Sequence, residues 1–282
     1  MRWKDYRQSS NVEDRRGMSA GGRGVAIGGG GIVLVLVLSL LTGQNPMVLL
    51  DEISGSQSQV SPDGATQGPV GAPSDEMGQF ASVVLASTED VWSQLIDGYK
   101  PPRLVLFSSA VDSACGYATA AAGPFYCPGD SHVYLDLSFF DELKQRFGAP
   151  GDLAQAYVIA HEVGHHVQNL LGTMRQFDAQ SQRMDERSRN ALSVRLELQA
   201  DCYAGVWGFY AQKRNLLEPG DLEEGMRAAA AVGDDQIQKR TQGYVVPEGF
   251  THGTAQQRQR WFKTGLDSGD PRSCNTIESR QL

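Results

Sequence analysis

The sequence lacks three features that would assign it to common classes of binding protein. It has no CxxC pair, so a cysteine-based zinc knuckle is not indicated. It has no basic excess, because the formal net charge is -8 at pH 7, and this argues against a general nucleic-acid binder. It shows no internal repeat. What is present, 282 residues of which 40% are hydrophobic and 21% charged, suits one globular domain with appendages.

Cysteine is scarce, and the chain has only Cys115, Cys127, Cys202 and Cys274. In an exported protein an even number of cysteines favours two disulfides, and four cysteines allow three pairings. We favour Cys115 with Cys127, which closes a short Gly/Ala-rich loop, and Cys202 with Cys274, which ties a helix to the C-terminal tail. If the domain were cytoplasmic, four reduced and buried thiols would be the better interpretation.

Charged residues are absent from the stretch VAIGGGGIVLVLVLSLLT, residues 25–42. About 18 uncharged residues can just cross the hydrocarbon core of a bilayer. The segment before this run is basic, with cations at Arg2, Lys4, Arg7, Arg15, Arg16 and Arg23. A basic flank is expected to stay in the cytoplasm, which would place the C-terminal bulk outside. We favour an uncleaved single-span anchor over a cleaved signal peptide, because no clear small-x-small site follows.

The chain is thus predicted to have four parts. They are a basic cytoplasmic tail (1–24), a transmembrane anchor (25–43), a disordered linker (44–75) and one domain (76–282). The linker prediction rests on residues 51–75, which are rich in Ser, Gly, Pro and Gln. Such a stretch cannot bury enough apolar surface to offset its chain entropy. The domain would therefore lie in the extracytoplasmic space, held to the cell membrane by the anchor.

Within the domain, helical patterns outnumber strand patterns. Apolar residues recur at helical spacing in 77–100, and helices are expected at 153–171 and about 187–213. Strands are expected at 103–109 and 132–138, with a loop over 110–131 between them. Capping-box patterns open three further helices, at Ser138/Asp141, Asp221/Glu224 and Thr254/Gln257. We therefore predict a mostly helical α+β fold with a small sheet early in the domain.

The stretch AHEVGHHVQ, residues 160–168, places His161 and His165 one turn apart on a predicted helix. Histidines at this spacing lie on one face and can bind the same ion. Glu162 points slightly around the helix, so it can contact a metal-bound water as a general base. The rest of that face is apolar, and polar groups there cost desolvation free energy unless they are paired or bind a metal.

A catalytic zinc needs a third protein ligand. The metzincin pattern HExxHxxGxxH would supply a histidine, but HEVGHHVQNLLG has none at the required place. The better candidate is RLELQADCYAGVW, residues 195–207, where Glu197 and Asp201 are four apart on an otherwise apolar helix. We predict that Glu197 binds zinc and that Asp201 accepts a hydrogen bond from the far nitrogen of a ligand histidine. The alternative is a solvated polar face.

Several segments together resemble the family of bacterial neutral zinc metallopeptidases, single-span membrane proteins with a gluzincin-type site. They are HEVGHHVQ, RLELQADCYAGVW, AAAVGDDQIQ and PEGFTHGTAQQRQRWFKTGLDSGD, with the opening MRWKDYRQSSNVEDRRG. The resemblance implies a zincin-like fold, zinc as cofactor, and hydrolysis of a peptide or protein outside the cytoplasm. The family's metal motif falls on His161, Glu162 and His165. Its second motif falls on Glu197 and Asp201.

In the mechanism that we expect, zinc lowers the pKa of its water toward about 7 and Glu162 takes up the proton. The developing oxyanion needs a further electrophile. His252, in FTHGT before a predicted helix, is the candidate, and a structural loop histidine is an equal alternative. Asp234 and Asp235 stay outside the predicted site. The strand at 132–137 is expected to pair with an extended substrate through backbone bonds.

Two other functions remain open. One is an exported zinc-binding module that no longer catalyses and acts in protein binding or assembly. Glu162 argues against it, because a purely structural zinc site does not need a general base. The other is a membrane-tethered interaction protein without a metal, against which the two histidines and Glu197 speak. The sequence predicts no oligomeric state.

Overall fold

The two strands predicted from apolar runs lie at the centre of the sheet. The computed structural model describes residues 1–18 and 68–282, and in it these strands are β2 (Arg103–Phe107) and β6 (His132–Asp136). They pair in parallel along their whole length. Residues 104–107 and 133–135 are buried, because helices cover one face of the two strands and residues of β3, β4 and β5 pack on the other. Strands that are buried on both faces have continuous apolar sequences.

The stretch 110–131, predicted as a loop, contains three short strands. β3 (Ala110–Ser113) and β4 (Gly116–Thr119) form a separate antiparallel hairpin. β5 (Phe125–Cys127) pairs antiparallel with β6, which gives the main sheet the order β1-β2-β6-β5. β3 and β4 consist mostly of small residues, and β5 has only three residues, so none of them shows the alternating apolar pattern of a longer half-buried strand.

The first 16 residues are part of the same folded unit as residues 68–282. After the 3-10 turn η1 (Trp3–Asp5), β1 (Val12–Asp14) pairs in parallel with β2 at the edge of the sheet. The prediction of a separate tail over 1–24 therefore does not hold for residues 1–16. Three strand residues inside a basic stretch give no periodicity, and their pairing partners lie about 90 positions away in the chain.

The folded unit also extends before its predicted start at residue 76, because residues 68–75 belong to it. The predicted anchor at 25–43 lies outside the described residues, as does the linker from 44 to 67. Among the residues that the structure describes, no helix has the length and apolar character needed to cross a membrane.

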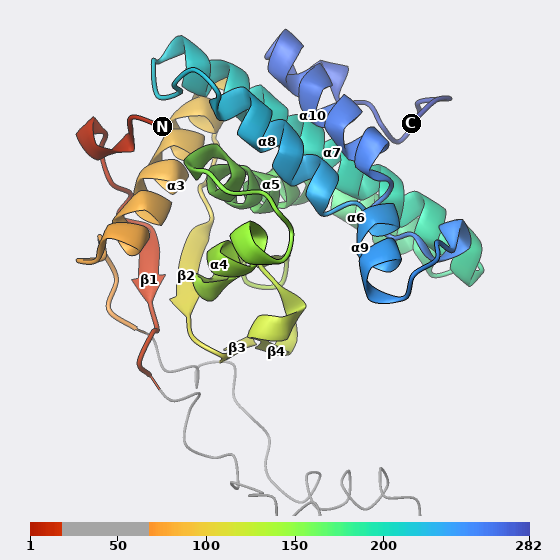
Figure 1. Cartoon of the computed structure of the whole chain (residues 1–282), viewed down its shortest axis with the longest axis horizontal. Helices are drawn as coiled ribbons and strands as arrows, with labels where there is room; N and C mark the ends of the chain where they lie inside the picture. The colour runs from red at the N-terminus through yellow and green to blue at the C-terminus, as the bar shows by residue number, and fades with distance from the viewer. Residues whose placement is uncertain (19–67) are drawn as a thin grey trace, which may run out of the picture. The chain divides into compact units, whose positions relative to one another are not determined.

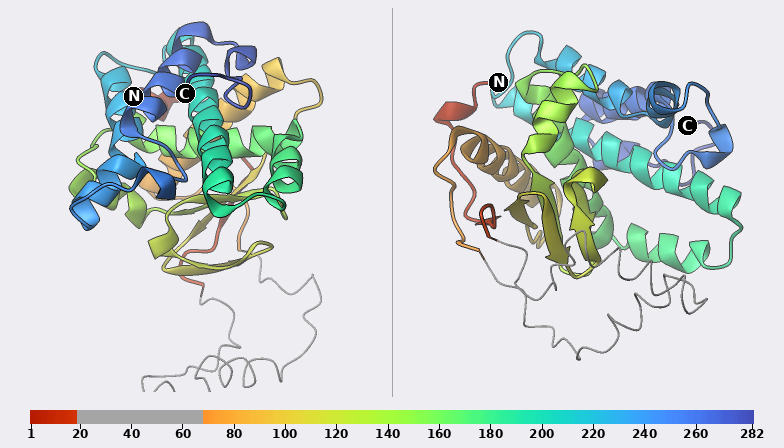
Figure 2. Two further views of the ribbon diagram at one scale, coloured as in Figure 1. Left: turned by 90° about the vertical axis from the view of Figure 1, so that its right-hand side faces the viewer. Right: turned by 60° about the horizontal axis from the view of Figure 1, so that its bottom comes forward.

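The long predicted helices are present, and they form a layer over the sheet (Figures 1 and 2). The helices are α3 (Glu76–Leu95), α4 (Ser138–Gln145), α5 (Asp152–Leu170), α6 (Thr173–Ser181), α7 (Glu186–Lys213), α8 (Asp221–Ala231), α9 (Asp234–Thr241) and α10 (Ala255–Ser268). Three more 3-10 turns are η2 (Ala120–Ala122), η3 (Pro247–Gly249) and η4 (Pro271–Ser273). The described part of the chain is therefore mostly helical α+β, as predicted.

One of the three predicted capping boxes forms. At the start of α10, Thr254 and Gln257 bond reciprocally to each other's backbone N–H. The other two do not form, because α4 follows Leu137 and α8 follows Gly220, and neither has a side-chain capping bond.

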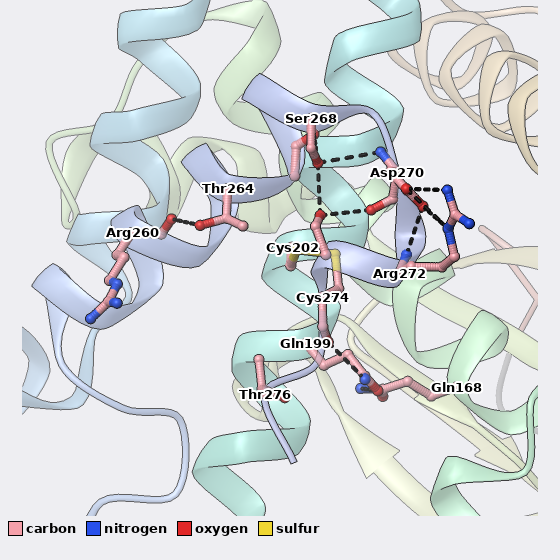
Figure 3. Close-up of a disulfide and its surroundings, with 12 residues drawn as sticks. Gln168, Gln199, Cys202, Arg260, Thr264, Ser268, Asp270, Arg272, Cys274 and Thr276 are labelled. Atoms are coloured by element: carbon pink, nitrogen blue, oxygen red, sulfur yellow. Dashed lines mark hydrogen bonds and ion pairs between the residues drawn. A yellow bond between two sulfur atoms is a disulfide. The ribbon is translucent and has the colours of Figure 1, made fainter. Parts of the chain in front are cut away.

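Both predicted disulfides are present, Cys115–Cys127 and Cys202–Cys274. The first closes the segment that carries β4, η2 and β5. The second joins the middle of α7 to the segment after η4, beside the place where α10 crosses α7 (Figure 3). At that crossing Gly205 faces Gly265 without a side chain between them, and a Cβ on either would overlap the backbone of the other helix.

Candidate metal centre

The histidines of the HEVGH motif lie on the buried part of α5. His161, Glu162 and His165 are only 7%, 7% and 9% exposed. The two imidazole rings meet nearly at right angles, with centroids 4.8 Å apart. The four-residue spacing therefore brings both rings to one face of the helix, as predicted.

Gly164, between the two histidines, marks the crossing of α5 and α7. A Cβ at this position would lie 2.9 Å from the carbonyl oxygen of Ala200 and 3.1 Å from its Cα. Only glycine allows the two backbones to come this close. Because Glu197 lies almost one turn before Ala200, the crossing brings its carboxylate to the two histidine rings.

The three predicted metal ligands meet at this crossing. Oε2 of Glu197 lies 3.2 Å from Nε2 of His161, and Oε1 lies 3.4 Å from Nε2 of His165. One donor atom from each residue lies within 4.8 Å of the other two. Zinc bonds of about 2.0–2.2 Å in a tetrahedral arrangement separate neighbouring donors by about 3.3 Å. The spacing and the donor set of two imidazoles and one carboxylate therefore fit a zinc ion with one position open.

The far nitrogen of His161 is held by Asp201, which is fully buried. Oδ1 of Asp201 lies 2.9 Å from Nδ1 of His161 and also accepts a bond from the Tyr157 hydroxyl. Arg258 of α10 donates to both carboxylate oxygens, at 2.8 and 2.9 Å. With Nδ1 donating to Asp201, Nε2 of His161 keeps its lone pair toward the metal position. Asp201 therefore lies where its predicted role requires.

His165 is held in the same way by a neutral amide. Its Nδ1 lies 2.9 Å from Oε1 of Gln168, and the amide of Gln168 donates to the side chain of Gln199 at 3.1 Å. Gln199 in turn donates to the carbonyl of Cys274 at 3.0 Å, next to the disulfide (Figure 3). A line of hydrogen bonds thus connects the C-terminal segment with a metal ligand.

The buried charges of the site compensate one another. Burial alone would lower the pKa of His161, but the Asp201 and Glu197 carboxylates outweigh it and raise that pKa to about 10. Burial would raise the pKa of Glu197, yet the two histidines hold it well below its usual range. Burial likewise opposes ionisation of Asp201, and Arg258 with His161 keeps its pKa low. The carboxylates therefore favour positive charge between the imidazoles, which a bound cation supplies.

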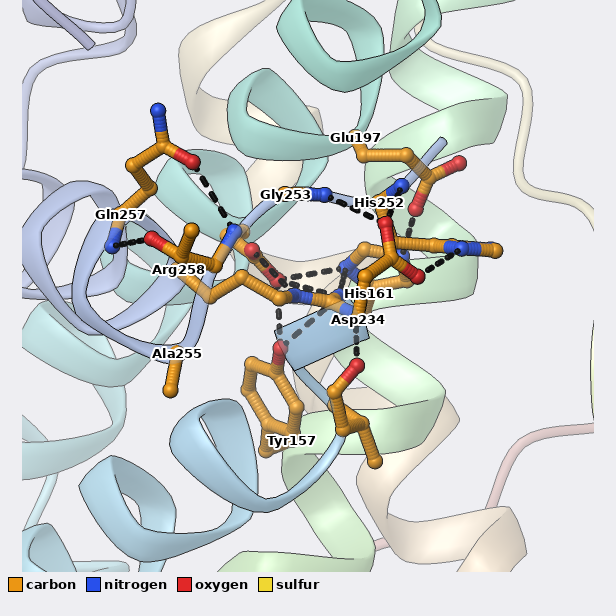
Figure 4. Close-up of polar contacts among 12 residues, drawn as sticks. Tyr157, His161, Glu197, Asp234, His252, Gly253, Ala255, Gln257 and Arg258 are labelled. Atoms are coloured by element: carbon orange, nitrogen blue, oxygen red, sulfur yellow. Dashed lines mark hydrogen bonds and ion pairs between the residues drawn. The ribbon is translucent and has the colours of Figure 1, made fainter. Parts of the chain in front are cut away.

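His252, the predicted oxyanion group, lies before α10 and close to Glu197 and His161 (Figure 4). Oδ2 of Asp234 accepts the backbone N–H groups of residues 251, 252 and 253 at 2.8, 2.6 and 3.0 Å. Oδ1 of Asp234 lies 3.2 Å from Nδ1 of His252. The hydrogen bond to Asp234 raises the pKa of His252, and the charge of Glu197 acts in the same direction. Asp234, which the sequence left outside the site, therefore fixes both the loop and the ring.

A cavity of about 640 Å³ opens over the three candidate metal ligands. Glu162 and His252 line it together with them. One part of the lining comes from residues 120–126, which include η2 and the start of β5. Another part comes from α4, α5, α9 and the connections beside them. It includes Glu142 and Arg146 and the apolar side chains of Phe139, Phe147, Val158, Val232 and Ile237. The cavity therefore combines a polar centre with a pocket for an apolar group.

The strand beside the cavity is β5, and this corrects the prediction for 132–137. β6 has no open edge, because β2 and β5 pair with its two sides. β5 is the edge strand, and its Tyr126 hydroxyl lies 3.1 Å from Nδ1 of His166 and accepts from Asn169 at 2.9 Å. His166 of α5 is buried, and its contact with Tyr126 holds β5 against α5, away from the three candidate ligands.

Comparison with known proteins agrees with this site. A family model described as "Putative neutral zinc metallopeptidase" matches residues 1–277. The chain belongs to this family. The match extends over β1 and over every residue of the candidate site, so it includes the N-terminal residues that pack into the domain.

Curated relatives cover most of the length of the chain. The uncharacterized protein YpfJ of Escherichia coli is 49% identical over 287 residues, with 98% of this chain and 99% of that protein covered. The uncharacterized protein Rv2575 of Mycobacterium tuberculosis is 43% identical over 258 residues, 86% of each chain. No solved structure matches the chain.

Proposed function

We propose that the protein is a zinc-dependent peptidase of zincin-like fold that hydrolyses peptide bonds. The observation that carries the proposal is the convergence of two imidazole nitrogens and the Glu197 carboxylate at zinc-ligand spacing, with Glu162 in the same cavity. A structural zinc site is closed by four protein ligands, whereas three ligands facing a cavity leave a position for a reacting molecule.

Each polar residue of the cavity has a distinct role in this proposal. Zinc at this site would supply a Lewis acid for the peptide carbonyl and for the attacking water. Glu162 takes up the proton of that water and later delivers it to the leaving amine. His252 donates a hydrogen bond to the developing oxyanion. Asp201 and Gln168 keep the ligand histidines in the tautomer that leaves each Nε2 free for the metal.

The substrate in this proposal is an extended peptide segment. Its backbone would pair with the open edge of β5, which gives affinity with little dependence on side chains. The apolar pocket beside Val158, which lies one turn before His161, would take one large apolar side chain next to the scissile bond. A peptide library incubated with the enzyme should therefore show cleavage enriched at large apolar residues on one side of the bond.

Metal dependence tests the proposed function directly. The full-length chain is needed, because residues 1–16 are part of the folded unit. We expect about one zinc per chain by elemental analysis, cleavage of library peptides, loss of cleavage with a chelator, and recovery when zinc is restored. One bound zinc without cleavage of any library peptide would favour the non-catalytic binding module instead, and absence of zinc would remove both functions.

Replacing His252 with alanine is expected to lower kcat by about 10²-fold. This is the lower end of the range for loss of an oxyanion donor, and we expect it because the His252 side chain is half exposed. Zinc content and KM should change little. His132→Ala is the matched control, since His132 lies outside the cavity lining. An unchanged kcat in His252→Ala would assign His252 to loop structure alone.

Replacing Asp234 with asparagine should move the alkaline limb of the rate profile to lower pH. The bond to Asp234 raises the pKa of His252, so in the parent the donating, protonated ring persists to higher pH. Protonated His252 is lost as pH rises through this pKa, and without the carboxylate the loss begins earlier. The measurement is kcat against pH for both proteins. Identical alkaline limbs would show that Asp234 does not act through His252.

A further inference from the structure

The chain leaves the folded unit and returns to it at the same place. The backbone N–H of Asp14 donates to the carbonyl of Pro69 at 3.0 Å, and that of Gly71 donates to the carbonyl of Val12 at 2.9 Å. These bonds pair residues 12–14 with residues 69–71 in an antiparallel manner. The segments on both sides of residues 19–67 are therefore neighbours at one edge of the sheet.

Two buried side chains bind residues 1–16 to the rest of the unit. Glu13 is 1% exposed and pairs with Arg103 of β2 at 3.1 Å. Trp3 is 9% exposed, and its ring packs edge-on against Phe80 of α3 with centroids 5.5 Å apart. Withdrawing these residues would leave Arg103 without this carboxylate and would expose Phe80 and the edge of β2. The fold of the domain therefore requires residues 1–16 to be present beside it.

Four of the six cations before the apolar run have carboxylate partners in residues 68–282. The pairs are Arg2–Glu218, Lys4–Glu76, Arg7–Glu89, Arg7–Asp90 and Arg16–Asp75. Arg15 pairs with Glu13 inside the N-terminal segment, and Arg23 lies outside the described residues. The positive-inside rule treats such cations as a marker of the cytoplasmic side. Here they serve the fold, so their number does not indicate the side on which the N-terminus lies.

We propose that residues 1–16 and the domain 68–282 lie in one compartment, on the same side of any membrane that the chain meets. A single crossing would separate the two parts, and two crossings need about 40 apolar residues. The run is too short for that.

This inference goes beyond the proposed function and holds whether or not the protein cleaves peptides. It replaces the orientation that the basic flank suggested, with the N-terminus in the cytoplasm and the domain outside. Its physical basis is that β1 and the two buried side chains cannot be paired with the domain through a lipid layer.

Thiol labelling of the full-length chain in intact spheroplasts tests the proposal. The four native cysteines are in disulfides, so a single introduced thiol is the only free one. Ser10→Cys reports the N-terminal residues and Gln180→Cys reports the domain, and both positions are exposed. We expect a membrane-impermeant maleimide to label the two positions equally before lysis and equally after it, because both share one compartment. Labelling of Gln180→Cys before lysis but Ser10→Cys only after it would overturn the proposal.

A stability measurement on the purified protein tests the packing of residues 1–16 without depending on expression level. Trp3→Ala in the purified full-length chain should lower Tm by about 5–10 °C, because a large side chain leaves the core. Gln8→Ala, an exposed position in the same segment, should leave Tm unchanged. Equal Tm values for Trp3→Ala and the parent would show that residues 1–16 are not packed in the domain and would also overturn the shared compartment.

Discussion

Glu162→Gln is expected to lower kcat/KM for peptide cleavage by about 10²- to 10⁴-fold, the range that general acid-base catalysis contributes. Glutamine keeps the size of the side chain but cannot take up a proton. Zinc content should not change, because Glu162 is not among the ligand group of two histidines and Glu197. The measurement combines initial rates on one peptide with elemental analysis of the same sample.

A matched substitution separates the loss of the base from a general effect of lost charge. Glu223 is exposed on α8, outside the cavity lining, and Glu223→Gln should retain the parent rate and zinc content. If Glu162→Gln retains the parent rate with zinc bound, the carboxylate is not the base, and the proposed mechanism fails. Loss of zinc in Glu162→Gln would instead indicate that this carboxylate takes part in metal binding.

The candidate metal ligands could be predicted because each lies in a local pattern. His161 and His165 share a face at four-residue spacing, and Glu197 is a charged residue on an apolar helix, where burial demands a partner. The distance between the two helices could not be predicted from either helix alone. It depends on Gly164, whose missing side chain lets α5 and α7 touch. In the HEVGH motif this glycine is neither a predicted ligand nor the predicted base, so the sequence alone does not show its role.

Apart from Asp201, the residues that orient the side chains of the site were missed, although two of them left a signal. Gln168 lies three residues after His165, a spacing at which helical side chains meet. Arg258 lies on the same stripe of α10 as the buried Trp261, Phe262 and Gly265, so it is an arginine in an apolar face. Asp234 left no such signal, because its bonds to the loop before α10 depend on chain geometry alone.

The fold could be predicted where an apolar periodicity extends over several turns. Prediction failed where a strand depends on a partner far away in the sequence. α3, α5 and α7 have enough turns to show their apolar stripes. β1 has three residues, and its strand character comes from pairing with residues 104–106. The cations around it were interpreted as a cytoplasmic flank, and the positive-inside rule takes no account of carboxylate partners in a fold, such as Glu89 for Arg7.

Arg258→Met is expected to lower the free energy of unfolding by about 3–5 kcal/mol, because it leaves the buried Asp201 without its cationic partner. Arg258 is 4% exposed and gives both of its short bonds to Asp201. Arg260→Met is the control on the same helix. Arg260 is exposed, so the same substitution there should cost less than about 0.5 kcal/mol. Chemical denaturation of the three proteins measures the difference.

The same variant also tests whether Arg258 acts on the metal site through Asp201. Zinc affinity should fall by about 10- to 100-fold in Arg258→Met, as for other groups that orient a ligand histidine. Asp201→Asn in the Arg258→Met background should recover part of the stability, because a neutral amide needs no counter-charge but still accepts from Nδ1 of His161. A double variant that loses the sum of the two single effects would show that Arg258 and Asp201 act independently, contrary to the contacts between them.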